Sequence, residues 1–265
     1  MTDQAFPDLM AAAASGHATI TTGWMQGRAA YGGLGAALAA AAMRAALPET
    51  LAAGLSMRSL SVSFVAPIPA GDVAVSAELL RVGKNVAQVS ARISDGEQVC
   101  LQAAAAFGTA RETLDVAPVA TFRPEPRDSV PALDARSGML PPFLRFFDGH
   151  WTGGGIPMSG AKDRRLGMWV RHNSDMSAYP AEAIIGIADI PPPVMLSHYS
   201  RPVRASSLSW SLEFVSPPES VAADWLYLDY TLEAAAGGYS QQSGLVFTED
   251  GELVALSRQT MTYFE

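Results

Sequence analysis

Residue types and spacings that carry chemistry in enzymes are sparse in this chain. Gly33-Leu34-Gly35 begins like the GxGxxG motif that binds dinucleotides. However, Leu38 stands where the third glycine belongs, and residues 26–30 do not resemble the buried strand that must precede such a loop. The pattern therefore disfavours a nicotinamide or flavin enzyme.

Metal and serine-hydrolase motifs are also missing. The four histidines (His17, His150, His172 and His198) are scattered, and the sequence holds no HxxxH or CxxC pair. A G-x-S-x-G nucleophile elbow is absent as well, which argues against an α/β-hydrolase. We expect neither a metal nor another cofactor.

Composition restricts the class of protein and of partner. The chain has 265 residues, 49% hydrophobic and 17% charged, which is enough for a sizeable core. The net charge of −8 argues against nucleic acid, because phosphate binding needs a basic face. Cys100 is the single cysteine and cannot form an internal disulfide, and the acidic start lacks the basic region of a signal peptide. We expect a cytoplasmic protein.

The stretch AAYGGLGAALAAAAMRAAL, residues 29–47, predicts a helix that is small and apolar on nearly every side. Its uncharged run ends at Arg44, so it is too short for a membrane span of about 20 residues. Pro48 ends the helix. A helix of this kind is surrounded by other elements, and we expect it at the centre of a domain.

Strands follow this helix from Arg58 onward. The stretches SLSVSFVAPIPAGD, VAVSAELLRVGKN and VAQVSARISDGEQVCLQAAAAFG alternate between apolar and polar residues and are separated by turn signals. Ser94–Glu97 predicts a tight hairpin with Gly96 at positive φ. The pattern indicates an antiparallel meander that curls around the helix.

The second half repeats the first. Ser59–Phe64 matches Ser207–Leu212, and Asp95–Val99 matches Asp250–Val254. A repeat of this length indicates two copies of one domain. The proline-rich region between them shows no sustained periodicity and indicates a linker. We predict a first domain at 1–110, a linker at 111–142 and a second domain at 143–265.

The order of these motifs resembles the TesB-type acyl-CoA thioesterases. The Gly-Gly entry to a small-residue helix, the strands that end in proline, LLRVGKNVAQVSA and DGELVALSRQ carry the resemblance from about Thr19 to Phe264, except in the linker. It implies an α+β double hotdog, in which two antiparallel sheets each wrap around a central helix. It also implies an acyl-CoA substrate.

The same resemblance implies a catalytic group of Asp189, Ser207 and Gln259. A carboxylate can take a proton from water as a general base, and a hydroxyl and an amide can orient that water. This route hydrolyses a thioester without an acyl-enzyme. Applied to the repeat, the offsets place Ala41, Ser59 and Ala104 opposite the three residues, which predicts one active site per chain.

Each of the three residues also has a structural interpretation. Asp189 could cap a helical turn at 191–198, because a proline follows two residues later. Ser207, Ser209 and Ser211 could form a solvated strand face, because they alternate with apolar residues. Gln259 could be an ordinary exposed glutamine of the last strand.

Gly32 and Gly33 are the expected substrate-binding positions. They allow a substrate or a strand to approach the start of the helix closely. Whether their N–H groups bind the thioester carbonyl or the glycines only permit packing stays open at this level. We predict an acyl-CoA thioesterase; the alternatives are a catalytically silent acyl-CoA or lipid-binding protein and action on an aryl or carrier-bound thioester. No membrane span is expected, and a homodimer is a hypothesis.

Overall fold

The computed structural model describes residues 3–264 except 53, 136–137, 139 and 223. The α-helices are α1 (Phe6–Ala14), α2 (Gly32–Ala45), α3 (Glu49–Ala52) and α4 (Pro180–Ala188). The 3₁₀ turns are η1 (Thr22–Trp24), η2 (Arg127–Ser129), η3 (Pro142–Phe146), η4 (Val194–His198) and η5 (Pro218–Ser220). Within the described part of the chain, none of these helices is long and apolar enough to cross a membrane.

The strands form one antiparallel sheet of 11 strands in the order β1-β5-β6-β7-β4-β10-β13-β12-β11-β9-β8. The first half contributes β1 (His17–Ile20), β5 (Gly71–Val82), β6 (Val86–Asp95), β7 (Gln98–Gly108) and β4 (Ser56–Phe64). The second half contributes β10 (Arg204–Phe214), β13 (Leu253–Phe264), β12 (Tyr239–Thr248), β11 (Leu226–Ala236), β9 (Arg165–His172) and β8 (Phe147–Gly153). A separate ribbon pairs β2 (Met25–Gln26) with β3 (Ala29–Ala30).

The two expected sheets are therefore joined into one. Strand β4 pairs with β10 from Ser59↔Glu213 to Ser63↔Ser209. Each of these strands would otherwise leave a row of backbone N–H and C=O groups unpaired at the edge of its own half. The pairing satisfies both edges and makes the halves continuous, which corrects the expectation of two sheets.

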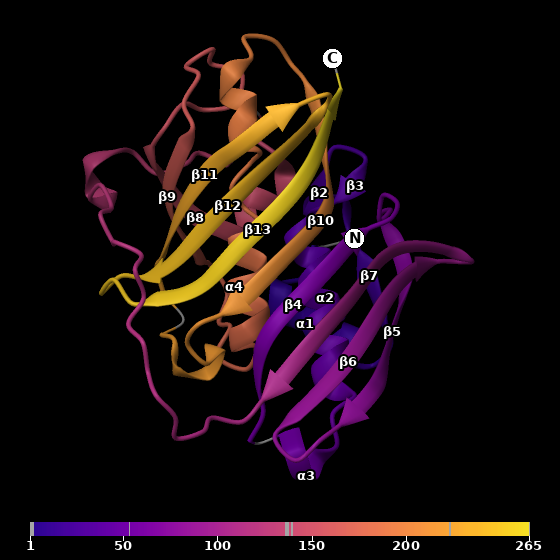
Figure 1. Ribbon diagram of the computed structural model, residues 1–265. Helices are drawn as coiled ribbons and strands as arrows, with labels where there is room; N and C mark the ends of the chain where they lie inside the picture. Colours follow the sequence, from indigo (N-terminus) through magenta and orange to yellow (C-terminus); the bar gives the residue numbers. More distant parts are fainter. Residues whose placement is uncertain (1–2, 53, 136–137, 139, 223, 265) are drawn as a thin grey trace.

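Helices α1, α2 and α4 lie on one face of this sheet (Figure 1). Helix α2 packs against α1, α4 and strands β5 to β7, and its residues 33–43 are all buried. Small side chains make this close packing feasible: a Cβ on Gly35 would lie only 2.7 Å from Cδ1 of Ile68. The helix is central, as its composition predicts. The Gly96 hairpin turn also has the predicted positive φ, of 56°.

Each half has a β-bulge near the start of the strand that pairs with the other half, β4 in the first half and β10 in the second. In β4 the pairing register shifts between Met57 and Ser59, and in β10 it shifts between Ser207 and Ser209. Matching the bulges aligns Met57 with Ser207. The proposed match of Ser59 with Ser207 is therefore wrong by two residues, because a slip of two residues leaves the alternation of apolar and polar side chains unchanged and the sequence comparison could not detect it.

The same strand register also changes which residue of the first half is equivalent to Gln259. Gln259 pairs with Trp210, and Ala105 pairs with Leu60, at the matching position of the first half. Ala105 and Gln259 are both buried, whereas Ala104, the residue expected from sequence, is exposed. Met57 and Ala105 supply neither a hydroxyl nor an amide at these two positions of the first half.

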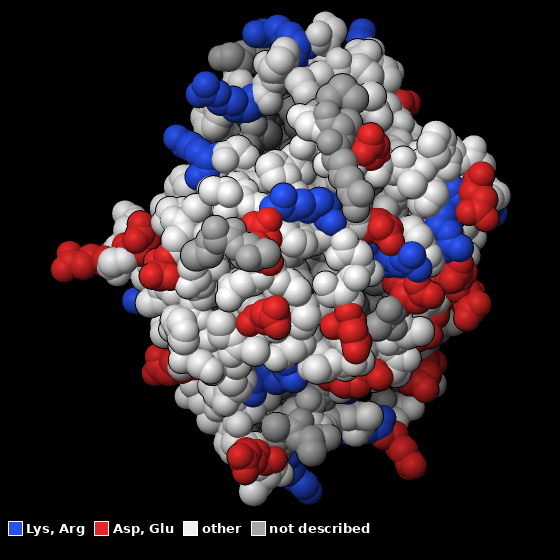
Figure 2. All heavy atoms as spheres, turned by 180° about the vertical axis from the view of Figure 1, so that it is seen from behind, with Lys and Arg blue, Asp and Glu red and all other residues white. Residues whose placement is uncertain are grey.

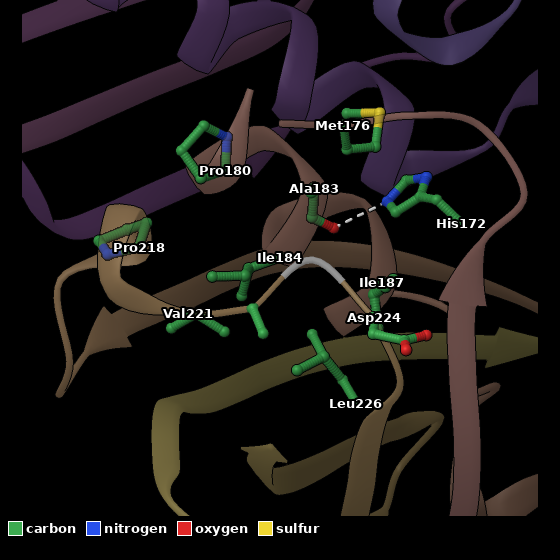
Figure 3. Close-up of a pocket in the computed structure, with 11 residues that line it drawn as sticks. His172, Met176, Pro180, Ala183, Ile184, Ile187, Pro218, Val221, Asp224 and Leu226 are labelled. Carbon is green, nitrogen blue, oxygen red and sulfur yellow. Dashed lines mark hydrogen bonds between the residues drawn. The ribbon is translucent and has the colours of Figure 1, made fainter. Parts of the chain in front are cut away.

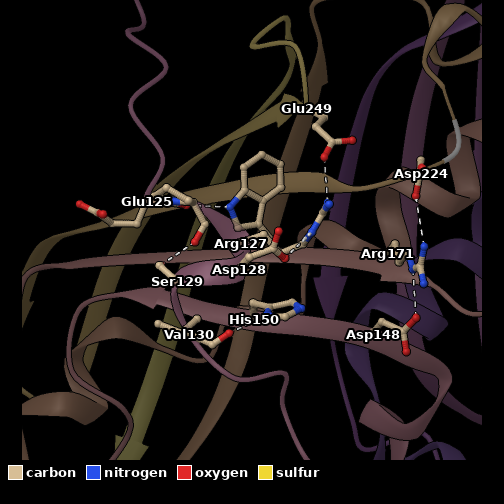
Figure 4. A network of polar contacts seen from close by, with 12 residues as sticks. Glu125, Arg127, Asp128, Ser129, Val130, Asp148, His150, Arg171, Asp224 and Glu249 are labelled. Carbon is tan, nitrogen blue, oxygen red and sulfur yellow. Dashed lines mark hydrogen bonds and ion pairs between the residues drawn. The ribbon is translucent and has the colours of Figure 1, made fainter.

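The region between the halves crosses the outer face of the second half. The Trp169 indole donates to the carbonyl of Glu125 at 3.0 Å, and Arg127 pairs with Glu249 at 2.9 Å (Figure 4). Phe122 packs against the rings of Trp169 and Phe247. These contacts fix part of the predicted linker on the sheet.

The charges are distributed unevenly over the side seen from behind the sheet. Figure 2 shows Asp and Glu over the middle, the lower part and both edges, and several Lys and Arg residues toward the upper left with others at the right edge and the bottom. The upper end is the one at which β10 begins and β13 ends (Figure 1). The net charge of −8 therefore does not make every part of the surface acidic.

Candidate active site

Asp189 stands at the end of α4. This helix is apolar, begins with Pro180, and is buried over residues 181–188. It ends before the three consecutive prolines at 191–193, which cannot continue it. Asp189 is the C-cap residue of α4, whereas the next helical turn, η4, has Pro193 at its N-cap. The alternative that Asp189 caps that next turn is therefore wrong.

The bulge in β10 turns Ser207 toward the interior. Ser207 pairs with Met261, and Trp210 pairs with Gln259; both partners on β13 are buried. Residues paired across an antiparallel ladder share a face, so Ser207 lies on the inner face although its spacing from Trp210 is odd. Ser209 stays exposed. The solvated-face interpretation fits Ser209 but is wrong for Ser207.

Gln259 joins the other two residues. Its side chain is only 4% exposed, which contradicts the alternative of an ordinary surface glutamine. Its Nε2 donates to Asp189 Oδ1 at 2.8 Å and to Ser207 Oγ at 3.0 Å. The three residues, 70 positions apart at most, thus form one hydrogen-bonded group, with Gln259 between the carboxylate and the hydroxyl.

The environment of Asp189 favours its neutral form. Desolvation by burial raises the pKa of Asp189 from 3.8 to about 7, against the opposing effects of the Gln259 amide and the Gly33 backbone N–H. Both of these donors stabilise the carboxylate. A carboxyl group with a pKa near 7 can accept and return a proton close to neutral pH.

Gly32 and Gly33 bring the N-terminus of α2 against this carboxyl group. A Cβ on Gly32 would lie 2.7 Å from Asp189 Oδ2, too close for any larger residue unless the carboxyl group moved. The N–H of Gly33 donates to Asp189. The first N–H groups of a helix lack intrahelical partners and carry the positive end of its dipole. The site therefore combines an element of the first half with three side chains of the second.

Two tyrosines that the sequence did not single out as site residues hold the end of α4. The Tyr31 hydroxyl donates to the Gly186 carbonyl at 2.6 Å, and the Tyr230 hydroxyl donates to the Ala188 carbonyl. Burial raises the pKa of both hydroxyl groups, so they remain protonated donors. They satisfy carbonyls that a helix leaves free at its C-terminus, directly before Asp189.

A separate hollow, open to solvent, lies along α4 (Figure 3). His172 Nε2 donates to the Ala183 carbonyl at 3.0 Å, and burial lowers the pKa of His172 to about 4. The histidine is therefore neutral near pH 7. The hollow is lined by His172, Met176, Pro180, Ala183, Ile184, Ile187, Pro218, Val221, Ala222, Asp224 and Leu226. It does not include Asp189, Ser207 or Gln259, so it is distinct from the hydrogen-bonded group.

Two family models match this sequence. The acyl-CoA thioesterase N-terminal domain matches residues 20–108, and the acyl-CoA thioesterase C-terminal domain matches residues 123–263. A search of curated protein sequences gives no significant match.

Solved structures with a similar fold superpose on nearly the whole chain. A hotdog-fold protein of unknown function from Alicyclobacillus acidocaldarius superposes with a TM-score of 0.82 at 21% identity, covering 94% of this chain and 92% of that one. The tesB protein of Mycobacterium avium subspecies paratuberculosis gives 0.76 at 18% identity, covering 99% and 100%. The acyl-CoA thioesterase II TesB2 of Mycobacterium marinum gives 0.72 at 20% identity, covering 89% and 90%. At these identities the likeness shows a hotdog fold.

Proposed function

The chain belongs to the TesB-type acyl-CoA thioesterases and is a thioester hydrolase, and from this premise we propose that Asp189, Ser207 and Gln259 activate the hydrolytic water. The observation that carries the proposal is the pair of hydrogen bonds from Gln259 Nε2 to Asp189 and Ser207. These bonds hold a base and a hydroxyl around one point at the N-terminus of α2. An acyl-CoA is the proposed substrate.

In the proposed reaction a water molecule attacks the thioester carbonyl carbon. Asp189 takes one proton from this water as the new C–O bond forms. The first-turn N–H of Gly32 and the positive end of the α2 dipole stabilise the negative charge that develops on the carbonyl oxygen, while the Gly33 N–H continues to donate to Asp189. When the C–S bond breaks, Asp189 returns the proton to the leaving thiolate. The products are a carboxylic acid and a thiol, and Asp189 is again a carboxylate.

Ser207 and Gln259 position the water in this proposal. The two protons of the Gln259 amide point to Asp189 and Ser207, so its contribution is to fix the base and the hydroxyl relative to each other. The Ser207 oxygen accepts from Gln259, which leaves its own O–H available to the water. Holding the reactants in this way reduces the entropy cost of the attack.

The proposed architecture is a double hotdog that arose by duplication. We assign the first unit to residues 1–110, the linker to 111–142 and the second unit to 143–265. The support is that each half contributes a central helix and a set of antiparallel strands, with a bulge at the matching place.

Thiol release from short, medium, long and aromatic acyl-CoAs tests the proposed site. Wild type is compared with Asp189→Asn and with Asp250→Asn, an exposed carboxylate in the turn before β13. We expect Asp189→Asn to lower kcat by about a hundredfold or more, as loss of a general base does, and Asp250→Asn to leave it unchanged.

Two outcomes would contradict the proposal. If turnover survives in Asp189→Asn, the chain hydrolyses thioesters by another base. If wild type binds acyl-CoA without turning over any member of the panel, while carrier-bound acyl groups are also inert, a ligand-binding role replaces the catalytic one.

A further inference from the structure

A second buried glutamine contacts the proposed catalytic group. Gln242 lies on the inner face of β12, directly opposite Gln259 in the ladder, and its side chain is fully buried. Its Nε2 donates to Gln259 Oε1 at 3.2 Å, and its Oε1 accepts from the Val194 backbone N–H at 3.0 Å. A fully buried amide is costly unless its polar atoms are paired, and both ends of this one are.

The Val194 N–H determines the direction of the whole chain of hydrogen bonds. Pro191, Pro192 and Pro193 have no N–H, so Val194 is the first backbone donor after Ile190. A backbone N–H can only donate, so the atom of Gln242 that faces it must be the oxygen. The NH₂ group of Gln242 then faces Gln259.

The same logic fixes the amide of Gln259. Since Gln242 presents its NH₂ group, Gln259 must present its oxygen to Gln242. The NH₂ group of Gln259 is thereby turned toward Asp189 and Ser207, where both of its protons are used. The reverse orientation would place the amide oxygen of Gln259 against the oxygens of Asp189 and Ser207.

We infer that Gln242 is a positioning residue, which holds the Gln259 amide in the one orientation that donates to Asp189 and Ser207. The inference rests on the proposed function, because it concerns the same catalytic group. Gln242 does not touch the reacting atoms; it acts through Gln259. The chain of hydrogen bonds runs from the Val194 N–H through the Gln242 and Gln259 side chains to Asp189.

Gln242→Leu and the neighbouring Gln241→Leu form a matched pair of variants. Both remove a glutamine amide from β12, but Gln241 lies on the other face of the strand. We expect Gln242→Leu to lower kcat about tenfold with KM changed less than twofold, and Gln241→Leu to leave both unchanged. Gln242→Met serves as a second removal of the amide, and thermal unfolding establishes that each variant is folded.

The pH profile and a double-mutant cycle separate positioning from packing. Donation by Gln259 lowers the pKa of Asp189, so Gln242→Leu should move the acidic limb of kcat to higher pH. In the background of Gln259→Leu, Gln242→Leu should have no further effect on kcat, because its route to the base is already removed.

The inference is overturned if the kcat effects of Gln242→Leu and Gln259→Leu multiply, if the acidic limb does not move, or if both removals of the amide leave kcat unchanged. These results are distinguishable from failure of the proposed function. If activity survives in Asp189→Asn, the assignment of Asp189 as the base is wrong. If Asp189→Asn loses activity but Gln242→Leu remains fully active, only the positioning role of Gln242 is rejected.

Discussion

Asp189 lies between the ends of two helices with opposite effects on its charge. It caps the C-terminus of α4, where the helix dipole is negative, and it faces the N-terminus of α2, where the dipole is positive. Burial dominates and raises the pKa of Asp189 to about 7. The ionised form that the proposed mechanism needs is thus the form that the folded protein stabilises less.

This cost predicts that Asp189→Asn stabilises the protein at alkaline pH. A carboxyl group with a raised folded-state pKa contributes stability below its unfolded value of 3.8, and that contribution is lost as the pH rises through about 7. The variant should therefore gain up to about 4 kcal/mol in free energy of unfolding at pH 8 and almost nothing at pH 4, at about 1.36 kcal/mol per pKa unit. Urea unfolding at both pH values measures this difference. An equal gain at pH 8 and pH 4 would contradict the assigned pKa.

Ser207 and Ser209 offer a direct test of the bulge in β10. Ser207 lies inward beside Gln259, whereas Ser209 is exposed. Ser207→Ala removes the hydroxyl that accepts from Gln259 and orients the water, so we expect kcat to fall about tenfold or more. Ser209→Ala should change kcat less than twofold. Equal effects in steady-state kinetics would mean that the two faces have been assigned wrongly.

At the scale of the elements, the start of α2 requires glycine. A Cβ on Gly32 would lie 2.7 Å from Asp189 Oδ2 and 3.2 Å from a ring carbon of Phe64. Gly32→Ala must displace the base, so we expect kcat/KM to fall at least tenfold. Gly153→Ala in β8 is the control, since its Cβ would meet nothing closer than 3.4 Å. Wild-type kinetics in Gly32→Ala would show that the carboxyl group tolerates the shift.

The central helix and the antiparallel strands could be predicted from sequence because they depend on local patterns. The alanine-rich composition of α2 and the alternation in β5 to β7 each reflect a single element. The bulge in β10 could not be predicted, because an extra residue changes the side-chain face without changing the alternating sequence. It is this bulge that brings Ser207 to Gln259.

Gln242 was missed for a related reason. The start of β12 reads YSQQSG, so both of its faces are polar and the alternation does not tell which one is buried. The family resemblance supplied Asp189, Ser207 and Gln259, but the residues that surround them depend on long-range pairing. The contact of Gly32 with Asp189 is a clear case, since the two lie on different halves of the chain.

At the scale of the whole molecule, the two halves are continuous through the β4–β10 pairing and through the contact of α2 with α4. An ion pair crosses this helix contact: Arg44 Nε lies 2.9 Å from Glu182 Oε1, and Glu182 is fully buried. Desolvation raises the pKa of Glu182, and Arg44 opposes that effect. A buried carboxylate that loses its partner is strongly destabilising.

Removing one partner of this pair should therefore cost more than removing both. We expect Arg44→Leu to lower the free energy of unfolding by about 3 kcal/mol, and Arg44→Leu with Glu182→Leu to recover most of that loss. Denaturant unfolding at pH 8 provides the comparison. A double variant that is no more stable than Arg44→Leu would contradict the view that the unpaired charge is the source of the loss.

The pH dependence of kcat/KM between pH 5 and pH 9 tests the central claim, that Asp189 is the base. Because the base must be ionised, the wild-type rate should rise with pH along an acidic limb with an apparent pKa near 7. In Asp189→Asn the residual rate should lose this limb. A wild-type profile that is flat across this range, or a limb that persists unchanged in Asp189→Asn, would show that another group accepts the proton from water.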